Sequence, residues 1–282
     1  MPQPQAAQHP PISIEFFPPN TLVGSEKLKT VVQELSVLNP EFFSVTYGAG
    51  GSTREKTLAT VRDIAAAGFE AAPHLSCVGS TREGIAEILA TYRAQGIHRL
   101  VALRGDLPSG TAVAGEFRYA SELVQFVRET QGPDWHIEVA AYPEYHPEQR
   151  YARRDLQHFA DKVACGANSA ITQFFFNPDA YFHFVDEARK LGVDVPIVPG
   201  IMPIHNFARI VQFAQRDGIE IPRWVMLKME GYLDDAASVR AFGIDVVTGL
   251  CQRLIDGGAP AIHFYALNQS ALTLEICQRL QG

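Results

Sequence analysis

The chain has 282 residues, of which 46% are hydrophobic and 20% charged, a composition typical of a globular protein and too apolar for a disordered one. Its formal net charge at pH 7 is −7, so the surface carries no general basic field that would attract nucleic acid or anionic lipid. No apolar run approaches the roughly 20 residues of a membrane span, and the first residues lack the pattern of a signal peptide. We therefore expect a cytoplasmic protein with a disordered tail at 1–11 and a single folded domain at 12–282.

Short, β-rich apolar runs alternate along the chain with segments that have apolar residues at helical spacing. The first of these helices carries Leu28, Val31, Val32 and Leu35 on one stripe, which fits packing against a sheet. Each predicted strand is thus followed by a covering helix. The eight predicted strands are residues 12–17, 42–48, 70–77, 99–106, 136–143, 169–176, 196–202 and 261–267.

Two local patterns refine this picture. The sequence Gly-Ser-Thr-Arg-Glu occurs at 51–55 and 79–83, one strand-helix step apart, and the spacing of its serine and glutamate predicts helices capped by Ser52 and Ser80.

The segment from 220 to 258 is too long for one turn. We expect it to form a loop through Trp224 and then a helix, with the loop as a candidate interface of a homo-oligomer.

Eight strand-helix units without a second compositional region predict an α/β fold of the (β/α)₈ TIM-barrel type, whose active site lies at the carboxyl ends of the strands. A doubly wound open sheet is the main rival, but the Gly-rich motifs that bind dinucleotides or phosphates in such folds are absent. Polar residues gather at the predicted strand ends. These are Glu15, Thr46, Tyr47, His74, Arg104, Asp106, Tyr142, Glu144, His146 and Gln173.

Glu15 is the first candidate catalytic residue because apolar residues flank it within the first strand. If the side chain points into the barrel, an apolar setting disfavours its ionised form, and it becomes a general acid near neutral pH. The alternative is a carboxylate that faces solvent or pairs with an arginine of the barrel.

Arg104 and Asp106 lie two residues apart and therefore share one side of a strand end. A simple salt bridge explains the pair, and so does a functional role at the strand-loop junction. Four further polar residues fall near one side of a predicted helix, where they either form a solvated face or anchor a long cofactor. They are Asp155, His158, Asp161 and Lys162.

Gln173 places an amide within an aromatic strand, either as a buried, satisfied side chain or as a group that recognises a heterocyclic ligand. Phe213 lies on an apolar helical stripe, so core packing is its default interpretation. A metal centre is not expected, since the His-Glu-x-x-His motif is absent and the four cysteines are widely spaced.

Seven motifs, in the same order along the chain, closely resemble the 5,10-methylenetetrahydrofolate reductase family. The motifs are SIEFFPP at 13–19, SVTYG at 44–48, AAPHL at 71–75, ALRGD at 102–106, AAYPE at 140–144, ITQFF at 171–175 and HFY at 263–265. The resemblance covers nearly the whole chain.

This resemblance implies a TIM barrel that binds FAD without a covalent link. Such a barrel oxidises NAD(P)H and reduces 5,10-methylenetetrahydrofolate to 5-methyltetrahydrofolate for methionine synthesis, in a ping-pong reaction at one flavin face. The chain ends soon after its last predicted helix, so we expect no inhibition by S-adenosylmethionine of the kind shown by eukaryotic relatives with an extra domain.

By resemblance, Glu15 matches the general acid that protonates N10 of the folate. Asp106 matches the aspartate near flavin and pterin, where its charge favours the cationic intermediate. Gln173 is similar to an amide that meets folate and nicotinamide, and Phe213 to a ring that packs on the substrate. The residues that match the cofactor site are Thr46, Tyr47, Ala49, His74, Arg104, Gly105, Asp106, Tyr119, Ala120, Tyr142, His146, Asp155, His158, Asp161 and Lys162.

Two positions depart from the family pattern. Gln269 stands where many members have arginine, and Arg209 stands where a glutamine is frequent. We expect Arg209 to supply the positive charge that position 269 lacks, toward the folate glutamate or the nucleotide.

Two other classes of protein fit parts of the sequence. A barrel lyase or aldolase that uses Glu15 and His74 for proton transfer needs no flavin and is colourless. A binding protein without catalysis retains folate or FAD as a ligand only.

Overall fold

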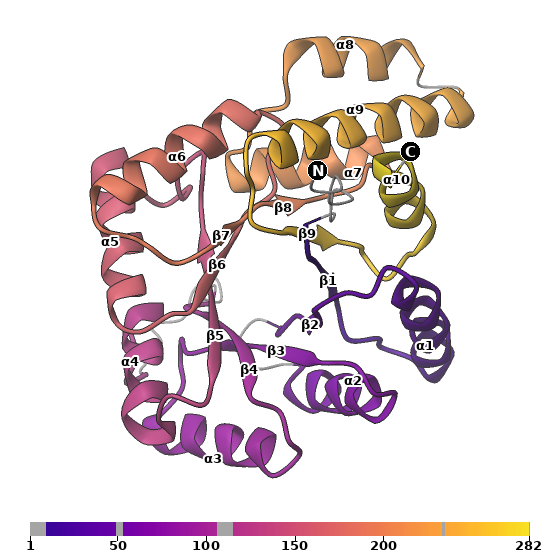
Figure 1. Cartoon of the computed structure of the whole chain (residues 1–282). Coiled ribbons are helices and arrows are strands. Elements are labelled where there is room, and N and C mark those ends of the chain that lie inside the picture. Colours follow the sequence, from indigo (N-terminus) through magenta and orange to yellow (C-terminus); the bar gives the residue numbers. More distant parts are fainter. Residues whose placement is uncertain (1–9, 49–52, 106–114, 233–234, 282) are drawn as a thin grey trace, which may run out of the picture.

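The computed structural model describes residues 10–48, 53–105, 115–232 and 235–281, and in it parallel strands are surrounded by helices (Figure 1). The strands are β1 (Ile12–Phe16), β2 (Phe42–Val45), β3 (Ala71–Ser76), β4 (Arg99–Leu103), β5 (His136–Ala141), β6 (Ser169–Thr172), β7 (Ile197–Val198), β8 (Gly200–Ile201) and β9 (Ile262–Tyr265). The helices are α1 (Leu22–Ser36), α2 (Arg54–Ala66), α3 (Arg82–Arg93), α4 (Ala120–Gln131), α5 (Ala152–Ala164), α6 (Pro178–Lys190), α7 (Phe207–Asp217), α8 (Arg223–Gly231), α9 (Ala236–Asp256) and α10 (Ala271–Gln281).

The strands form a nearly closed barrel, as predicted. Their order is β7-β6-β5-β4-β3-β2-β1-β9-β8, so the two ends of the sheet are β7 and β8. These two strands are the halves of the single strand predicted at 196–202. Pro199, which lies between them, has no N–H to donate to a ladder, and its carbonyl accepts a hydrogen bond from the His263 N–H at 3.0 Å. The segment that contains β7 and β8 is therefore interrupted at Pro199, and it brings the two edges of the sheet together.

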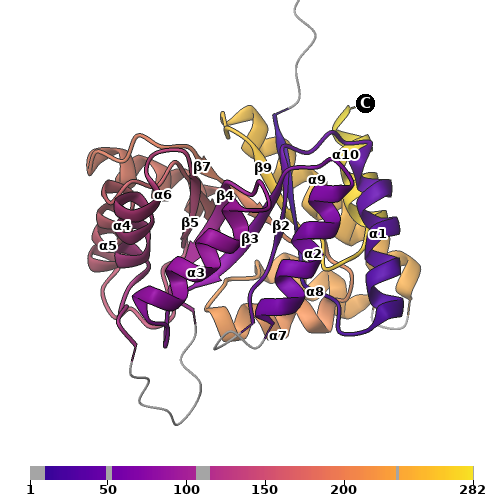
Figure 2. The same cartoon turned by 90° about the horizontal axis from the view of Figure 1, so that it is seen from below.

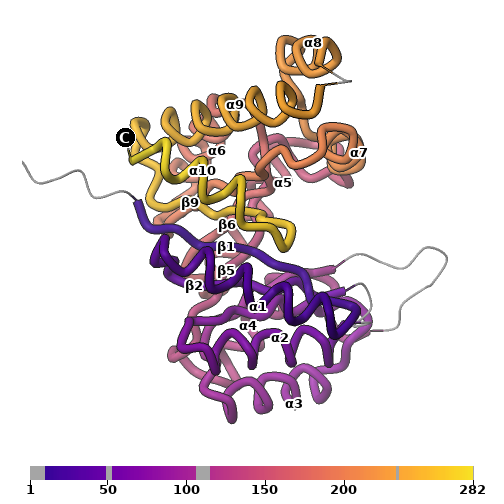
Figure 3. Tube along the Cα trace, turned by 90° about the vertical axis from the view of Figure 1, so that its right-hand side faces the viewer, coloured from indigo at the N-terminus to yellow at the C-terminus, as the bar shows by residue number. Residues whose placement is uncertain are grey.

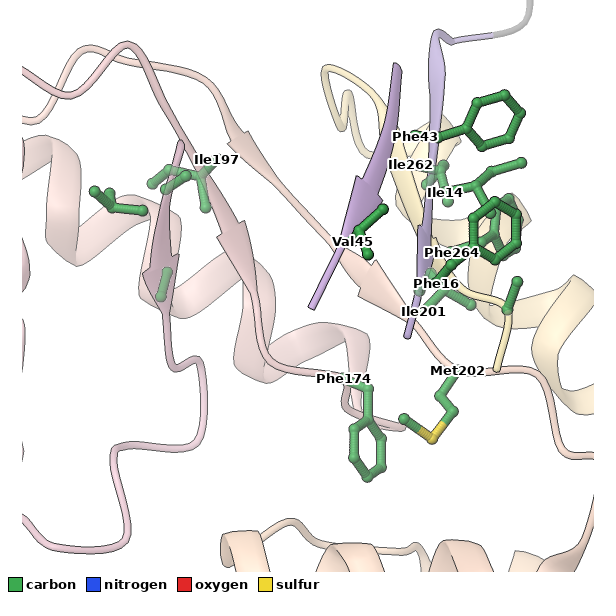
Figure 4. Packing of buried hydrophobic residues seen from close by; sticks show 14 of the residues in the cluster. Ile14, Phe16, Phe43, Val45, Phe174, Ile197, Ile201, Met202, Ile262 and Phe264 are labelled. Atoms are coloured by element: carbon green, nitrogen blue, oxygen red, sulfur yellow. The ribbon is translucent and has the colours of Figure 1, made fainter. Parts of the chain in front are cut away.

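The main core lies between the barrel and its helices. On β1, Ile14 and Phe16 point outward and are almost fully buried, and Phe16 stacks on Phe43 of β2 with ring centroids 5.4 Å apart (Figure 4). Because side chains alternate along a strand, Ser13 and Glu15 point into the barrel. The view from below shows the covering helices α1, α2 and α3 along one side of the strands (Figure 2).

The inside of the barrel has a second, small apolar cluster and a polar network near the amino ends of the strands. The network centres on Glu138, which is 2% exposed. Its Oε1 lies 2.7 Å from the Arg99 guanidinium and 3.1 Å from Nε2 of His136, and its Oε2 accepts a hydrogen bond from the Ser169 hydroxyl. The guanidinium of Arg99 also lies 4.4 Å from the ring centroid of Phe42. The small cluster contains Phe42, Ala72, Val101 and Ile171, with Leu103 packed against it.

The helix starts differ from the prediction by one residue. Thr53 and Thr81, and not Ser52 and Ser80, occupy the N-cap positions of α2 and α3. The Thr81 hydroxyl accepts the Gly84 N–H at 3.1 Å and so caps α3, whereas the Thr53 hydroxyl accepts the Gly48 N–H and makes no capping bond to α2. Ser52 itself lies outside the described residues.

The segment predicted as a loop through Trp224 is helix α8. Pro222 precedes the helix, and Val225 and Met229, four residues apart, are fully buried beneath it. We missed it because the helix is short and also carries apolar residues on its outer side. Helix α8 packs on α9 and lies outermost on this flank of the barrel (Figure 3), with Trp224 57% exposed. None of the described helices is long and apolar enough to cross a membrane.

The join between the two sheet edges leaves no room for a side chain at Gly200. A β-carbon there would collide with the carbonyl oxygen of Thr172 and lie 2.6 Å from Cε2 of Tyr265. We predict that Gly200→Ala lowers the free energy of unfolding by about 2 kcal/mol, the usual size of an overpacking penalty, as measured by urea denaturation.

Gly249→Ala is the matched control. Gly249 lies on α9, and a β-carbon there would have no heavy atom within 4 Å. This substitution should stabilise the protein by about 0.5 to 1 kcal/mol, because alanine favours a helix. Equal stability of the two variants would show that position 200 is not tightly enclosed.

Candidate active site

The candidate site centres on the carboxylate of Glu15, near the carboxyl ends of the strands. Its Oε2 lies 3.2 Å from Nε2 of His74 on β3 and 3.7 Å from Nε2 of His263 on β9. In the strand register, Glu15 lies opposite Ser44 of β2 and Tyr265 of β9. His263 lies opposite Ser13, which shares the face of β1 that carries Glu15. The Glu15 side chain is 17% exposed, so the carboxylate is deep but reachable.

Sequence reasoning missed two members of this cluster, Ser13 and His263. The Ser13 hydroxyl lies 2.7 Å from Nδ1 of His263, and both side chains are buried. Ser13 stands two residues before Glu15 and therefore shares its face of β1. That spacing was the available signal for Ser13, whereas the 250 residues between Ser13 and His263 hid the contact.

The expected effect of the surroundings on Glu15 is wrong. Burial does raise the pKa of this carboxyl group, but the charge of His74 and the contacts with both imidazoles outweigh it and lower the pKa from 4.5 to about 2. Glu15 is therefore ionised at neutral pH. The sequence showed the apolar neighbours along β1 but not the basic neighbours across the barrel.

Tyr265 completes the wall beside Glu15. Its hydroxyl donates to the carbonyl oxygen of Thr172 at 2.7 Å, which joins β9 to β6 across the barrel. Burial, and next the charge of Glu15, raise the pKa of Tyr265 well above its ordinary value. Its proton is accordingly held firmly, and its role at this point is structural.

A second polar group lies where β4 and β5 end and α5 begins. Arg104 pairs with Glu148 at 2.6 Å, a partner that sequence reasoning did not predict. The backbone N–H of His146 donates to the Asp155 carboxylate at 2.8 Å. The ring centroids of His146 and Tyr142 lie 4.6 Å apart. The loop after β5 is thus folded back onto the start of α5.

Helix α5 adds a partly buried cation to this group. The ammonium of Lys162 donates to the carbonyl oxygen of Ala140, and within the described part of the chain it has no carboxylate at ion-pair distance. Burial lowers the pKa of Lys162 to about 8, although the charge of Asp155 acts in the opposite direction. The ring of His158 stacks with that of Tyr119, at 6.2 Å between centroids.

Not all predicted cofactor residues come together. Asp161 is exposed and accepts a hydrogen bond from Gln157 at 2.9 Å, on a side of α5 away from Lys162. Asp106 and Ala49 lie outside the described residues, so the predicted Arg104–Asp106 pair is not tested. The remaining predicted residues follow β2, follow β4 or begin α4. They are Thr46, Tyr47, Gly105 and Ala120.

The predicted substrate residues lie along α7 and the ends of β6 and β9. The amide nitrogen of Gln173 approaches Asp217 at 3.3 Å, and its oxygen accepts the Phe174 N–H. Phe213 is half-buried against the core, under the guanidinium of Arg216. Gln173 is thus only loosely held by α7.

Arg209 and Gln269 lie on one shared pocket of about 220 Å³ at the start of α7. His205 and Asn206 line it as well, and the Asn206 side chain caps α7 by accepting the Arg209 N–H at 3.0 Å. The lining therefore combines a cation, amides and an imidazole, which are groups that recognise carboxylates and phosphates.

Comparison with known proteins identifies the fold and the family. A sequence model described as methylenetetrahydrofolate reductase matches residues 1–281. The chain belongs to the methylenetetrahydrofolate reductase family. It is 41% identical over 270 residues to the 5,10-methylenetetrahydrofolate reductase of Salmonella typhimurium and 40% identical to that of Escherichia coli, covering 95% of this chain and 90% of each relative.

A plant relative and a solved structure extend the comparison. The chain is 35% identical to a probable methylenetetrahydrofolate reductase (NADH) of Oryza sativa, and the match covers 95% of this chain and 48% of the plant protein. An uncharacterized protein from Clostridium thermocellum, which binds two copies of 5-methyl-5,6,7,8-tetrahydrofolic acid, superposes with a TM-score of 0.70 at 16% identity over 97% of this chain and 94% of that one. At that identity the likeness concerns the fold alone.

The low pKa of Glu15 has a measurable consequence for stability. A lowered carboxyl pKa contributes stability that is fully present above the unfolded value of 4.5 and is lost as the pH falls toward the folded value of about 2. We predict that the difference in free energy of unfolding between wild type and Glu15→Gln shrinks by about 1 kcal/mol between pH 5 and pH 3.5.

Urea denaturation of both proteins at the two pH values measures this change. All other carboxyl groups are common to the two proteins, so their titration cancels in the comparison. A difference that stayed constant over this range would mean that the imidazoles do not hold Glu15 in its ionised form.

Proposed function

We propose that this reductase-family protein reduces 5,10-methylenetetrahydrofolate to 5-methyltetrahydrofolate in the cytoplasm, with FAD as cofactor and NAD(P)H as electron donor. The product would feed methionine synthesis. Family membership supports the reaction, and the observation that carries the proposal is the buried Glu15 carboxylate held by two imidazoles at the mouth of the barrel. A lyase or a silent binding protein is disfavoured by the named function of the relatives.

The residues after β2 to β5 and on α5 fit an extended anionic cofactor such as FAD. Lys162 is a partly buried cation that has no carboxylate at ion-pair distance among the described residues, which suits a phosphate group. Tyr119, at the start of α4, is 54% exposed beside His158, so its ring face is available for stacking. We assign these residues to the cofactor, together with Thr46, Tyr47, His74, Arg104 and Tyr142.

When bound, FAD would supply the redox chemistry, by carrying hydride from NAD(P)H to the folate in two half-reactions of a ping-pong turnover. The protein supplies the proton and the orientation. Because Glu15 is ionised at neutral pH, the proton for N10 rests on an adjacent imidazole and passes through the carboxyl group. Protonation of N10 makes it a better leaving group, and we propose that Asp106 stabilises the cation that results.

Gln173 and Phe213 would orient the flat ring of each substrate in turn. The amide of Gln173 has both a donor and an acceptor, and its 3.3 Å contact with Asp217 is weak enough to exchange for a ligand. Phe213, half-buried on α7, would pack against the same ring.

Removal of the proton donor separates the two half-reactions. Glu15→Gln keeps the shape of the side chain but cannot transfer a proton, so we predict that folate reduction falls by about 10²- to 10⁴-fold while flavin reduction by NADH is preserved. Anaerobic absorbance spectra of the yellow enzyme, followed first with NADH and then with methylenetetrahydrofolate, measure each step. Equal loss of both steps would argue for a general structural defect and against an acid role.

The pocket shared by Arg209 and Gln269 would hold an anionic end of a substrate, either the glutamate of the folate or the phosphates of the nucleotide. We predict that Arg209→Ala raises the KM for methylenetetrahydrofolate or NADH by about tenfold, since a charged hydrogen bond is worth roughly 1.5 to 3 kcal/mol. Gln212→Ala, on an exposed position of the same helix, is the control and should leave both KM values unchanged. Unaltered KM values in Arg209→Ala would rule out this role.

A further inference from the structure

The two imidazoles beside Glu15 are not equivalent. Both approach the same oxygen, Oε2, but the side chain of His74 is 9% exposed whereas that of His263 is completely buried. His263 also lies among aromatic rings, with Phe42 at 6.2 Å and Tyr265 at 5.2 Å between centroids. The desolvation cost of a positive charge is therefore much higher for His263 than for His74.

Only one protonated imidazole balances the single negative charge of Glu15. Two would leave a net positive charge in a closed interior, at a high desolvation cost. The fully buried imidazole is accordingly the one that stays neutral.

Ser13 and Glu15 together decide where the proton of a neutral His263 sits, because a hydroxyl can donate or accept whereas a carboxylate only accepts. A neutral imidazole has one donor nitrogen and one acceptor nitrogen. If Nδ1 accepts the Ser13 hydroxyl at 2.7 Å, the proton is on Nε2 and faces Oε2 of Glu15. The opposite tautomer would turn a nitrogen lone pair toward a carboxylate, which is repulsive.

We propose that Ser13 and the Glu15 carboxylate together fix His263 as a neutral positioning residue, protonated on Nε2. Its N–H points toward Oε2 from 3.7 Å and stabilises the carboxylate by electrostatic attraction, while His74 exchanges the catalytic proton. The proton would move from Nε2 of His74 to Oε2 of Glu15 and then to the folate nitrogen, and His263 keeps its own proton throughout. This inference rests on the proposed acid role of Glu15. The other titratable groups that bear on the cluster are Tyr265 of β9, Tyr142 after β5 and Asp217 of α7.

The tautomer can be measured directly in the free protein. In a sample labelled with ¹⁵N-histidine, we expect His263 to show a protonated Nε2 and an unprotonated Nδ1 that do not change between pH 6 and pH 8. The missing signals of a His263→Gln variant give the assignment, and the Ser13→Ala spectrum should show that the fixed tautomer is lost. A cationic His263, or a proton on Nδ1, in the wild-type spectrum overturns the proposal even if the variants fold poorly.

Kinetics provide the second arm. We expect Ser13→Ala to slow folate reduction by about tenfold, the factor that corresponds to roughly 1.4 kcal/mol, with flavin reduction by NADH unchanged. Ser44→Ala is the matched control, since Ser44 is a buried serine paired with Glu15 in the sheet register whose hydroxyl has no hydrogen-bond partner in the described structure. Equal rates for the two alanine variants would contradict the positioning role.

The two arms separate this inference from the proposed function. If the wild-type protein reduced no folate, the reaction assignment would fail, while the NMR result would still decide the state of His263. If the protein reduced folate but His263 titrated or carried its proton on Nδ1, only the positioning role would fail.

Discussion

The arrangement of this protein depends on a carboxylate that is kept ionised inside the barrel by imidazoles from other strands. Burial alone works against the charge of Glu15, and the cluster persists because β1, β3 and β9 hold the three side chains within contact distance. Small changes in strand register would separate them, since a shift of one residue turns a side chain to the opposite face. Closure of the barrel is therefore a condition for the electrostatics of the site.

The two parts of the site are supported in different ways. The acid cluster stands on β1, β3 and β9, each of which pairs with a neighbouring strand on both sides, and this gives it a rigid base. The group assigned to the cofactor stands instead on strand-loop junctions and α5. There Arg104, His146 and Lys162 each bond to a residue of another segment, through an ion pair or a hydrogen bond. This division suits a barrel in which the reacting centre is fixed and the extended ligand is gripped at the rim.

The sequence alone was sufficient to predict the barrel, because each strand and most of the helices have a clear apolar period. It could not reveal the break at Pro199 as two separate strands, and it missed α8, whose nine residues are apolar on both sides. The importance of Glu15 was accessible from its setting, but the direction of its pKa shift was not. Against the effect of burial, that direction depends first on the charge of His74 and then on the contact with His263, and both histidines come from other strands.

The apolar cluster inside the barrel has a consequence for how the site exchanges protons. Phe42, Ala72, Val101 and Ile171 form this cluster, and the Phe42 ring contacts both His263 of the acid cluster and Arg99 of the network around Glu138. The Glu15 side chain keeps 17% of its surface exposed, and in a barrel of this type ligands bind at the carboxyl ends of the strands, where this carboxylate lies. A ligand bound there would cover the Glu15 carboxylate. The proton already held by the cluster would then be the one available for that turnover.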